Sequence, residues 1–228
     1  MKSVTYTSAV GCIMYAQVCT HPDIAFTTGM LGRYQKNLGI EYWKAVEKAL
    51  RYLQGTKSLM LSYRKSDAHK IVGYSDADWA GCKDTRRYTS GYIFTLAGGA
   101  IWWRSLKQTI VASSTMYAEF IACYEVIGQA LWLKKFILGL KVVDSTEKPL
   151  KLYCDNEPVI SYSYNNKSSG AAKHIDIKYY VVKEKVQDQT IEIEHIESEQ
   201  MLVNPLTKGL PPKVFREHLA GMGLMERL

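Results

Sequence analysis

Three carboxylates stand beside apolar segments, and this placement restricts what the chain can fold into. Asp76 follows the apolar run at 71–75, Asp155 follows the run at 150–154, and Glu119 lies near the start of a long amphipathic helix. A strand, a helix and a second strand can bring such acids together at one edge of a sheet. Hard divalent cations take oxygen ligands of this kind. The sequence therefore predicts an α/β fold with a cation site.

Each of these acids, taken alone, has a plainer explanation. Glu119 can stabilise its helix, because the helix dipole favours negative charge near the N-terminus. Asp76 can belong to an ordinary turn at a strand end, and Asp155 can in addition cap the helix that follows it. The apolar stripe around Glu119 argues for a site, because a carboxylate there is costly unless it is paired, hydrogen-bonded or bound to metal.

The first quarter of the chain is predicted to be helical. Helices are expected at 9–18, from His21-Pro22-Asp23 onward, and at 41–54. Proline is tolerated in the first turn of a helix, and apolar side chains recur at helical spacing along the third segment. No catalytic chemistry is visible here, so these helices are interpreted as a docking or substrate-guiding element.

The remainder of the chain alternates strands and helices. Strands are predicted at 71–75, 91–96, 100–104, 150–154 and 190–196, and 59–64 is a short strand or the end of a linker. Helices are predicted at 115–138, 157–164, 171–187 and 198–206. A strand meander followed by crossovers is typical of an α/β fold with a mixed sheet. We expect a helical segment at 1–58, a linker at 59–69, an α/β domain at 70–208 and a helical tail at 209–228.

The chain is basic, with a net charge of +7 over 228 residues. Residues 1–70 carry net +6 and the remainder net +1, so the excess lies outside the predicted site. A basic balance is compatible with a nucleic-acid partner. The first third would then supply much of the long-range attraction, and a solvated helical surface explains the same charges equally well.

The cysteine pattern indicates a reducing compartment. The chain holds five, Cys12, Cys19, Cys82, Cys123 and Cys154, without any C-x-x-C spacing. An odd, scattered set argues against a disulfide scaffold or a zinc site. No signal peptide is evident, and no stretch approaches the ~18 apolar residues of a spanning helix. We expect an intracellular protein, in a cytoplasmic particle or the nucleus, with no membrane partner.

Several collinear motifs resemble copia-type retrotransposon Pol polyproteins. The ribonuclease H domain of that family is matched by YSDADWAG (74–81), TSGY (89–92), SST and AEF within 113–120, YCDN (153–156), KHID (173–176) and LTK (206–208). The C-terminal thumb and connection part of its reverse transcriptase is matched by YTSAVG (6–11), PDIA (22–25) and LRYLQGT (50–56). The resemblance covers nearly the whole chain. It assigns 1–58 to a reverse-transcriptase remnant and 70–208 to a ribonuclease H domain.

The resemblance implies both a fold and an activity. The fold is a ribonuclease H-like five-stranded mixed sheet of order 3-2-1-4-5, flanked by helices and preceded by a small helical segment. The activity is endonucleolytic hydrolysis of the RNA strand of RNA/DNA hybrids, with the remainder of the Pol polyprotein as a further partner. Asp76, Glu119 and Asp155 would hold two Mg²⁺ ions, for which Mn²⁺ can substitute. The polymerase's paired aspartates are absent, so no DNA synthesis is implied.

The chain departs from the family pattern at its fourth acidic position. Asn204 stands there, two residues before the LTK motif. An asparagine keeps a carbonyl oxygen that can ligate a metal but lacks the charge. We therefore expect Asn204 to belong to the catalytic site and to weaken the binding of one ion. Tyr117 also replaces an acid that is frequent in the family, a change that should matter less.

Basic and aromatic residues flank the predicted hairpin. Candidates for contacts with the hybrid backbone are Arg86, Arg87, Arg104 and Lys107. A solvated basic edge explains these four residues equally well. Trp102 and Trp103 are interpreted as sheet core and not as a platform for stacked bases.

Two alternatives to an active nuclease stay open. Loss of the acid at position 204 can leave a nucleic-acid-binding module without useful catalysis. The fragment can also be an interaction protein, because copia-like fragments have been labelled secreted RxLR effectors and the segment RYLQ (51–54) nearly spells that motif. Against this, RYLQ lies in a predicted helix and no leader precedes it. Cleavage that requires Asp76 separates the first hypothesis from the other two.

Overall fold

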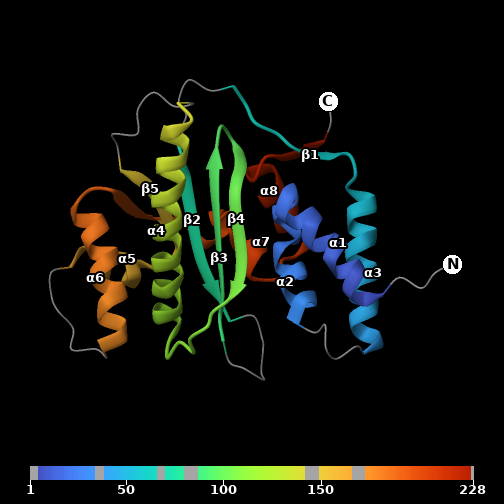
Figure 1. Cartoon of the computed structure of the whole chain (residues 1–228), viewed down its shortest axis with the longest axis horizontal. Helices are drawn as coiled ribbons and strands as arrows, with labels where there is room; N and C mark the ends of the chain where they lie inside the picture. Colours follow the sequence, from blue (N-terminus) through green and yellow to red (C-terminus); the bar gives the residue numbers. More distant parts are fainter. Residues whose placement is uncertain are drawn as a thin grey trace.

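A five-stranded sheet with helices on both faces forms the centre of the molecule (Figure 1). The computed structural model describes residues 5–33, 39–65, 70–79, 87–141, 149–165 and 173–226, with the backbone alone for 173–176. None of the helices in these ranges combines the length and the apolar character needed to cross a bilayer.

The sheet contains two kinds of strand pairing. Its strands are β2 (Val72–Asp78), β3 (Thr89–Leu96), β4 (Gly99–Lys107), β5 (Leu150–Cys154) and β6 (Ile191–His195). Their spatial order is β4-β3-β2-β5-β6, in which β2, β3 and β4 pair antiparallel and β2, β5 and β6 pair parallel. Counted along the chain this is the order 3-2-1-4-5, so the predicted fold class is confirmed. Parallel neighbours need crossovers, and helices supply them here.

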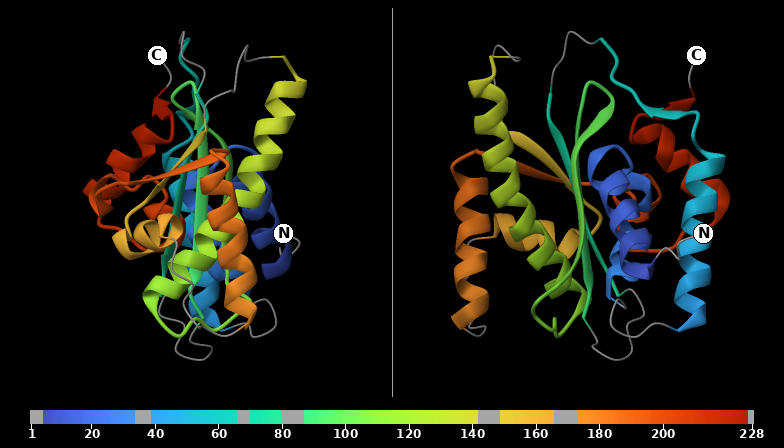
Figure 2. Two further views of the ribbon diagram at one scale, coloured as in Figure 1. Left: turned by 90° about the vertical axis from the view of Figure 1, so that its left-hand side faces the viewer. Right: turned by 45° about the vertical axis from the view of Figure 1, so that its right-hand side comes forward.

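Helices cover both faces of this sheet. They are α1 (Tyr6–Cys19), α2 (Ala25–Arg33), α3 (Ile40–Gly55), α4 (Thr115–Gly139), α5 (Glu157–Tyr164), α6 (Lys173–Gln187), α7 (Asn204–Thr207) and α8 (Pro212–Gly221), with the short 3-10 turns η1 (Pro22–Ile24) and η2 (Ser198–Gln200). Successive side chains of a strand point to opposite faces. Phe94 accordingly packs into the core under α4, α5 and α6, whereas Ile93 packs with Met201, Leu206 and Met222 on the other face. Figure 2 shows α4 and α6 on one side of the sheet and α8 on the other.

The first three helices form a core of their own and dock beside β4. Val10 of α1, Ile24 of η1 and Val46 of α3 are buried together in that core. Trp103 of β4 donates its ring N–H to the Gln17 carbonyl at 3.0 Å, which fastens α1 to the sheet. The three predicted helices are therefore present, and they lie along the β4 side of the sheet (Figure 1).

A two-stranded ribbon joins distant parts of the chain. The strands β1 (Leu59–Leu61) and β7 (Leu224–Glu226) pair antiparallel. The segment expected as a linker thus begins with a strand, and the segment expected as a helical tail holds α8 followed by a strand. The Ala100 N–H donates to the Met222 carbonyl at 2.9 Å, which ties this ribbon to the start of β4.

Two local predictions differ from the structure. The single helix expected at 198–206 is divided into η2 and α7, because Pro205 fits the first turn of a helix but would break its interior. Trp102 is not sheet core, since 39% of its surface is exposed and it packs against Trp132 with ring centroids 5.3 Å apart. β4 is an edge strand, so Trp102 lies at the margin of what α4 covers.

Gly91 of β3 sets how closely α7 approaches the sheet. A Cβ atom at this position would lie 2.6 Å from Thr207 Cγ2 and 3.0 Å from Val203 Cγ2. We predict that Gly91→Ala displaces α7 and lowers the free energy of unfolding by about 1–3 kcal/mol, the usual cost of overpacking. Chemical denaturation of both proteins measures this change.

Gly128→Ala is the matched control for that measurement. Gly128 lies in the middle of α4 with nothing within 4 Å of the position its Cβ would take. The free energy of unfolding should then rise by about 0.5–1 kcal/mol, because a flexible residue leaves a helix interior. If Gly91→Ala were as stable as the wild-type protein, the close contact between β3 and α7 would be refuted.

Candidate functional site

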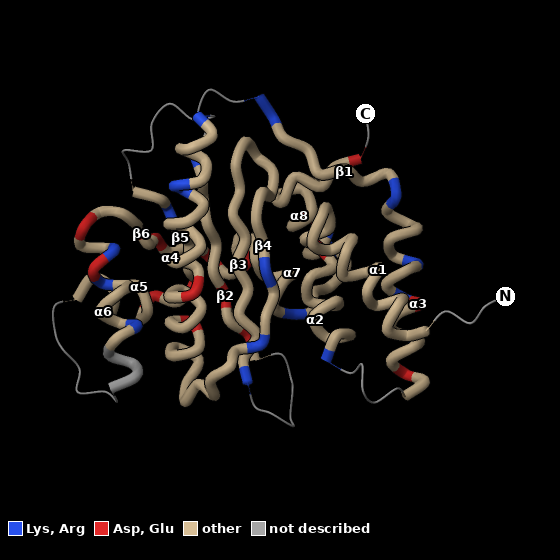
Figure 3. The backbone as a smooth tube through the Cα atoms, viewed as in Figure 1, with Lys and Arg blue, Asp and Glu red and all other residues tan. Residues whose placement is uncertain are grey.

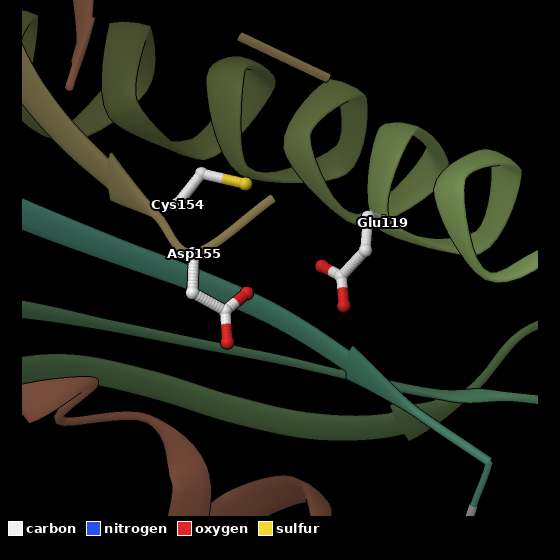
Figure 4. Close-up of side chains that lie close together, drawn as sticks. All are labelled: Glu119, Cys154 and Asp155. Carbon is white, nitrogen blue, oxygen red and sulfur yellow. The ribbon is translucent and has the colours of Figure 1, made fainter. Parts of the chain in front are cut away.

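The predicted acids come from three elements and approach each other at one end of the sheet. Asp76 belongs to β2, Glu119 to α4, and Asp155 directly follows β5. Because β2 and β5 are parallel neighbours, their carboxyl ends share one edge of the sheet. One oxygen of Glu119, one oxygen of Asp155 and the Cys154 Sγ lie within 4.8 Å of one another. Figure 4 shows the Glu119 side chain reaching down from its helix toward Asp155.

Asp76 is buried and is contacted by the segment at α7. Only 2% of its surface is exposed. Its Oδ2 accepts a hydrogen bond from the Thr207 hydroxyl and lies 3.8 Å from Lys208 Nζ. Burial raises the pKa of Asp76, while Lys208 and Thr207 act in the opposite direction by stabilising the anion. Thr207 and Lys208 are close to Asp76 in space but more than a hundred residues from it in the sequence: Thr207 is separated from Asp76 by 131 residues.

The environment of Glu119 disfavours the charged carboxylate more strongly than that of Asp76 does. It is 4% exposed, and its Oε2 accepts a hydrogen bond from the Ala77 N–H at 3.0 Å. Burial raises its pKa well above the usual range for a glutamate, and the charges of Asp76 and Asp155 add to that rise. No acid lies in the first turn of α4, so an effect of the helix dipole on the first turn does not explain Glu119.

Asp155 is half-buried and faces the turn η2. Its Oδ2 accepts a hydrogen bond from the Ser198 hydroxyl at 2.7 Å. The alternative that Asp155 caps α5 is wrong, because the Asn156 side chain fills that position and accepts from the Val159 N–H at 3.2 Å. The Asp155 carboxylate is therefore not used as a helix cap and can take part in the acidic cluster.

Asn204 lies beside the same turn. Its Nδ2 donates to the Ser198 carbonyl at 2.6 Å, so Ser198 contacts both Asn204 and Asp155. Asn204 is 5% exposed, and its Oδ1 is buried without a hydrogen-bond partner. A buried acceptor of this kind is rare unless an ion or water satisfies it.

The predicted substrate contacts divide into two groups. Arg87 and Lys107 lie at the same edge as the acids, because β3 begins at Thr89, which pairs with both Asp78 of β2 and Lys107 of β4. Figure 3 shows basic segments gathered at this end of β3 and β4. Arg104 lies farther from this edge, where β4 pairs with Tyr92 of β3. Arg86 falls outside the described residues.

The charge of Arg104 acts on Glu125 of α4. Burial raises the pKa of Glu125, and that rise is opposed by Lys178, by a hydrogen bond from Ser90 and by the Arg104 charge. Arg104 is exposed, so the solvent partly screens its effect on Glu125. Arg104 also lies farther from the edge with the acids than Arg87 or Lys107 does.

Sequence reasoning missed four residues around the site. Thr207 and Lys208 stand in the LTK motif that carried the resemblance, yet nothing local to that motif identifies Asp76 as their partner. Ser198 lies in a turn without a distinctive pattern. Arg33 of α2 donates to the Thr89 hydroxyl at 3.1 Å, which places a further basic side chain at this edge.

No protein-family model matches the chain, but individual proteins do. The chain is 42% identical over 226 residues to the retrovirus-related Pol polyprotein from transposon TNT 1-94 of Nicotiana tabacum, which covers 97% of this chain and 17% of that protein. It is 47% identical over 133 residues to secreted RxLR effector protein 161 of Plasmopara viticola, covering 58% of this chain and 94% of that one. LC11-RNase H1, solved in complex with an RNA/DNA hybrid, aligns at 18% identity and a TM-score of 0.41 over 58% of this chain and 88% of its own.

The strand order β4-β3-β2-β5-β6 is that of a ribonuclease H-like fold. The chain belongs to the copia-type retrotransposon Pol polyproteins. It spans about a sixth of the length of the tobacco polyprotein that it matches, 17%.

The raised pKa of Glu119 generates a prediction about stability in the absence of metal. A carboxyl whose pKa is higher in the folded than in the unfolded chain destabilises the fold above its unfolded pKa. Glu119→Gln should therefore raise the free energy of unfolding at pH 7 by about 0.5–2 kcal/mol, a range common for stabilising substitutions. The gain should shrink as pH falls and vanish below the ordinary glutamate range. Denaturation with chelator present, repeated across pH, measures it.

Glu184→Gln is the control, because Glu184 is an exposed acid of α6. A substitution on the surface should change the free energy of unfolding by less than about 0.5 kcal/mol at any pH. A loss of stability in Glu119→Gln at pH 7 would contradict the electrostatic description of the site.

Proposed function

We propose that the chain is a metal-dependent ribonuclease H that hydrolyses the RNA strand of RNA/DNA hybrids during reverse transcription of its element. The observation that carries the proposal is that Glu119 and Asp155 come within 4.8 Å of each other at the sheet edge where the buried Asp76 also lies and where the charges of the three acids act on one another. The charges in this cluster repel one another, and a cation would relieve the repulsion. The family to which the chain belongs supports the same assignment.

The donor set fits Mg²⁺. The three carboxylates and the unpartnered Asn204 Oδ1 are all oxygen donors, which magnesium prefers. The nearby Cys154 thiol is a poor ligand for this ion. Asp76, Glu119 and Asp155 would hold the metal, with Asn204 as a neutral fourth donor. Bound cations of this class lower the pKa of a ligated water and neutralise charge on a phosphodiester.

The chain's own residues hold this donor set in place. The Ala77 N–H fixes one oxygen of Glu119, the Ser198 hydroxyl fixes one of Asp155, and Thr207 fixes one of Asp76. Each acid is thus oriented by a hydrogen bond from a different segment. Such support keeps ligands within the narrow range of positions that catalysis requires.

Basic residues at the same edge would position the substrate. Arg87 and Lys107 would contact phosphates of the hybrid, since both lie where β3 and β4 end beside the acids. Contacts of this type fix register but carry no sequence information. Discrimination of RNA from DNA would rest on 2′-hydroxyl contacts and on the shape of the hybrid.

An interaction module without catalysis is the second candidate. It is favoured by Asn204 in place of an acid and by the 47% identity to a protein named as a secreted RxLR effector. The RYLQ segment lies in α3, where Arg51 is exposed and bonds Glu47 at 3.3 Å. The cleavage test below separates the two candidates.

The proposed nuclease should cut a labelled RNA/DNA hybrid in Mg²⁺ or Mn²⁺, and not duplex DNA. Asp76→Asn and Asp155→Asn should each lower the cleavage rate by more than about 100-fold, beyond the loss typical of an outer partner of a metal ligand. Preparing the variants in parallel excludes a contaminating host nuclease. Asn204→Asp should preserve or raise the rate.

Glu184→Gln is again the control, and it should cut at the wild-type rate. Cleavage that survives Asp76→Asn would refute the proposed catalytic site. A folded protein that binds the hybrid without cutting it would establish the binding module, and a gain of cleavage on Asn204→Asp would then identify the missing acid as the cause.

Arg87→Gln should weaken binding of the hybrid and make it less dependent on salt. Removing one phosphate contact lowers the slope of log K against log salt concentration by about one. Fluorescence anisotropy at several salt concentrations measures the slope. Lys183→Gln, a change on α6, should leave the slope unchanged, and equal slopes for both variants would remove Arg87 from the substrate contacts.

A further inference from the structure

Lys208 brings a positive charge to the acidic cluster. Its Nζ lies 3.8 Å from Asp76 Oδ2, and its side chain is only 30% exposed. The same Oδ2 accepts a hydrogen bond from Thr207. Both donors therefore act on the same oxygen of Asp76.

One short turn carries both the neutral Asn204 and this ammonium group. The Lys208 N–H donates to the Asn204 carbonyl at 3.0 Å, and the Thr207 hydroxyl lies 3.2 Å from the same carbonyl. The Asn204 side chain carries no charge, and its Oδ1 is buried without a hydrogen-bond partner. The turn therefore adds one positive charge and no negative charge.

The charges of the cluster match a single divalent cation. The ionised forms of Asp76, Glu119 and Asp155 carry three negative charges, and Lys208 cancels one of them. Asp78 also acts on Asp76, but it is half exposed at the strand end, where water screens it. A second divalent ion bound to Asp76 Oδ2 would compete with the Lys208 ammonium for that oxygen, and cations held so close together repel one another.

We propose that Lys208 takes the place of one metal ion, so that this site binds one divalent cation tightly instead of two. The inference rests on the proposed function, since it requires that the carboxylates hold a divalent cation. Lys208 is a positioning and charge-compensating residue in this scheme. Its ammonium, 3.8 Å from Oδ2, orients the Asp76 carboxylate and brings the positive charge that a second ion would otherwise supply.

Counting bound Mn²⁺ tests the proposal without any nuclease assay. Electron paramagnetic resonance of free Mn²⁺, titrated into the full chain in the absence of nucleic acid, gives the number of ions and their affinities. The wild-type protein should bind one ion, with any second at least about tenfold weaker. Lys208→Met should tighten the second ion by about tenfold or more, because the repelling charge is gone, and Lys208→Met with Asn204→Asp should bind two ions.

Two further variants control for loss of the lysine side chain itself. Lys208→Arg keeps the charge and should keep the count at one. Lys213→Met removes an exposed lysine of α8 and should behave as the wild-type protein. Circular dichroism confirms that each variant is folded before the titration.

Each possible result decides the question. Two ions of similar affinity in the wild-type protein would overturn the proposal, and so would equal titrations of Lys208→Met and Lys213→Met, since Lys208 would then be an ion pair that swings away when metal binds. Absence of Mn²⁺ binding in every folded variant would overturn the proposed metal site as well. A wrong count with intact, Asp76-dependent cleavage would overturn only the role of Lys208.

Discussion

The burial of like charges at one edge of the sheet is the constraint on which the rest of the structure depends. Asp76 and Glu119 are almost fully buried, and a buried carboxylate is costly unless donors compensate it. The donors come from β2 itself, from η2 and from α7, so these elements must be held in fixed relative positions. The parallel pairing of β2 with β5 provides one part of that arrangement, and the close approach of α7 at Gly91 provides the other.

The helices α1 and α2, which precede the sheet in the sequence, cover one of its edges. β4 is an edge strand, and exposed edges invite pairing with other chains. Trp103 of β4 bonds Gln17 of α1, and Arg33 of α2 bonds Thr89 at the start of the neighbouring β3. α1 and α2 therefore dock beside the edge that β4 would otherwise leave open. The β1–β7 ribbon joins the two parts again at the far end. The two segments therefore share one packed structure.

Sequence patterns predicted the elements better than their partners. The strands at 71–75 and 150–154 could be placed because apolar runs end at an acid, and the site followed from those ends. The strand order required the family resemblance, because periodicity carries no information about neighbours. Thr207 and Ser198 could not be assigned, because their hydrogen bonds to Asp76 and Asp155 span 131 and 43 residues. Trp102 was misjudged because burial at an edge strand depends on how far a neighbouring helix extends.

Asp76 and the turn that contacts it lie far apart in the sequence, so the ribosome makes Asp76 well before it makes that turn. β2 leaves the ribosome long before residues 204–208, so Asp76 exists for most of that time without Thr207 or Lys208 nearby. The first strands can pair through local hairpin contacts, which form early. The acidic edge reaches its final geometry only when α7 settles over Gly91, so a chain halted before that turn would hold the sheet but leave its carboxylates uncompensated.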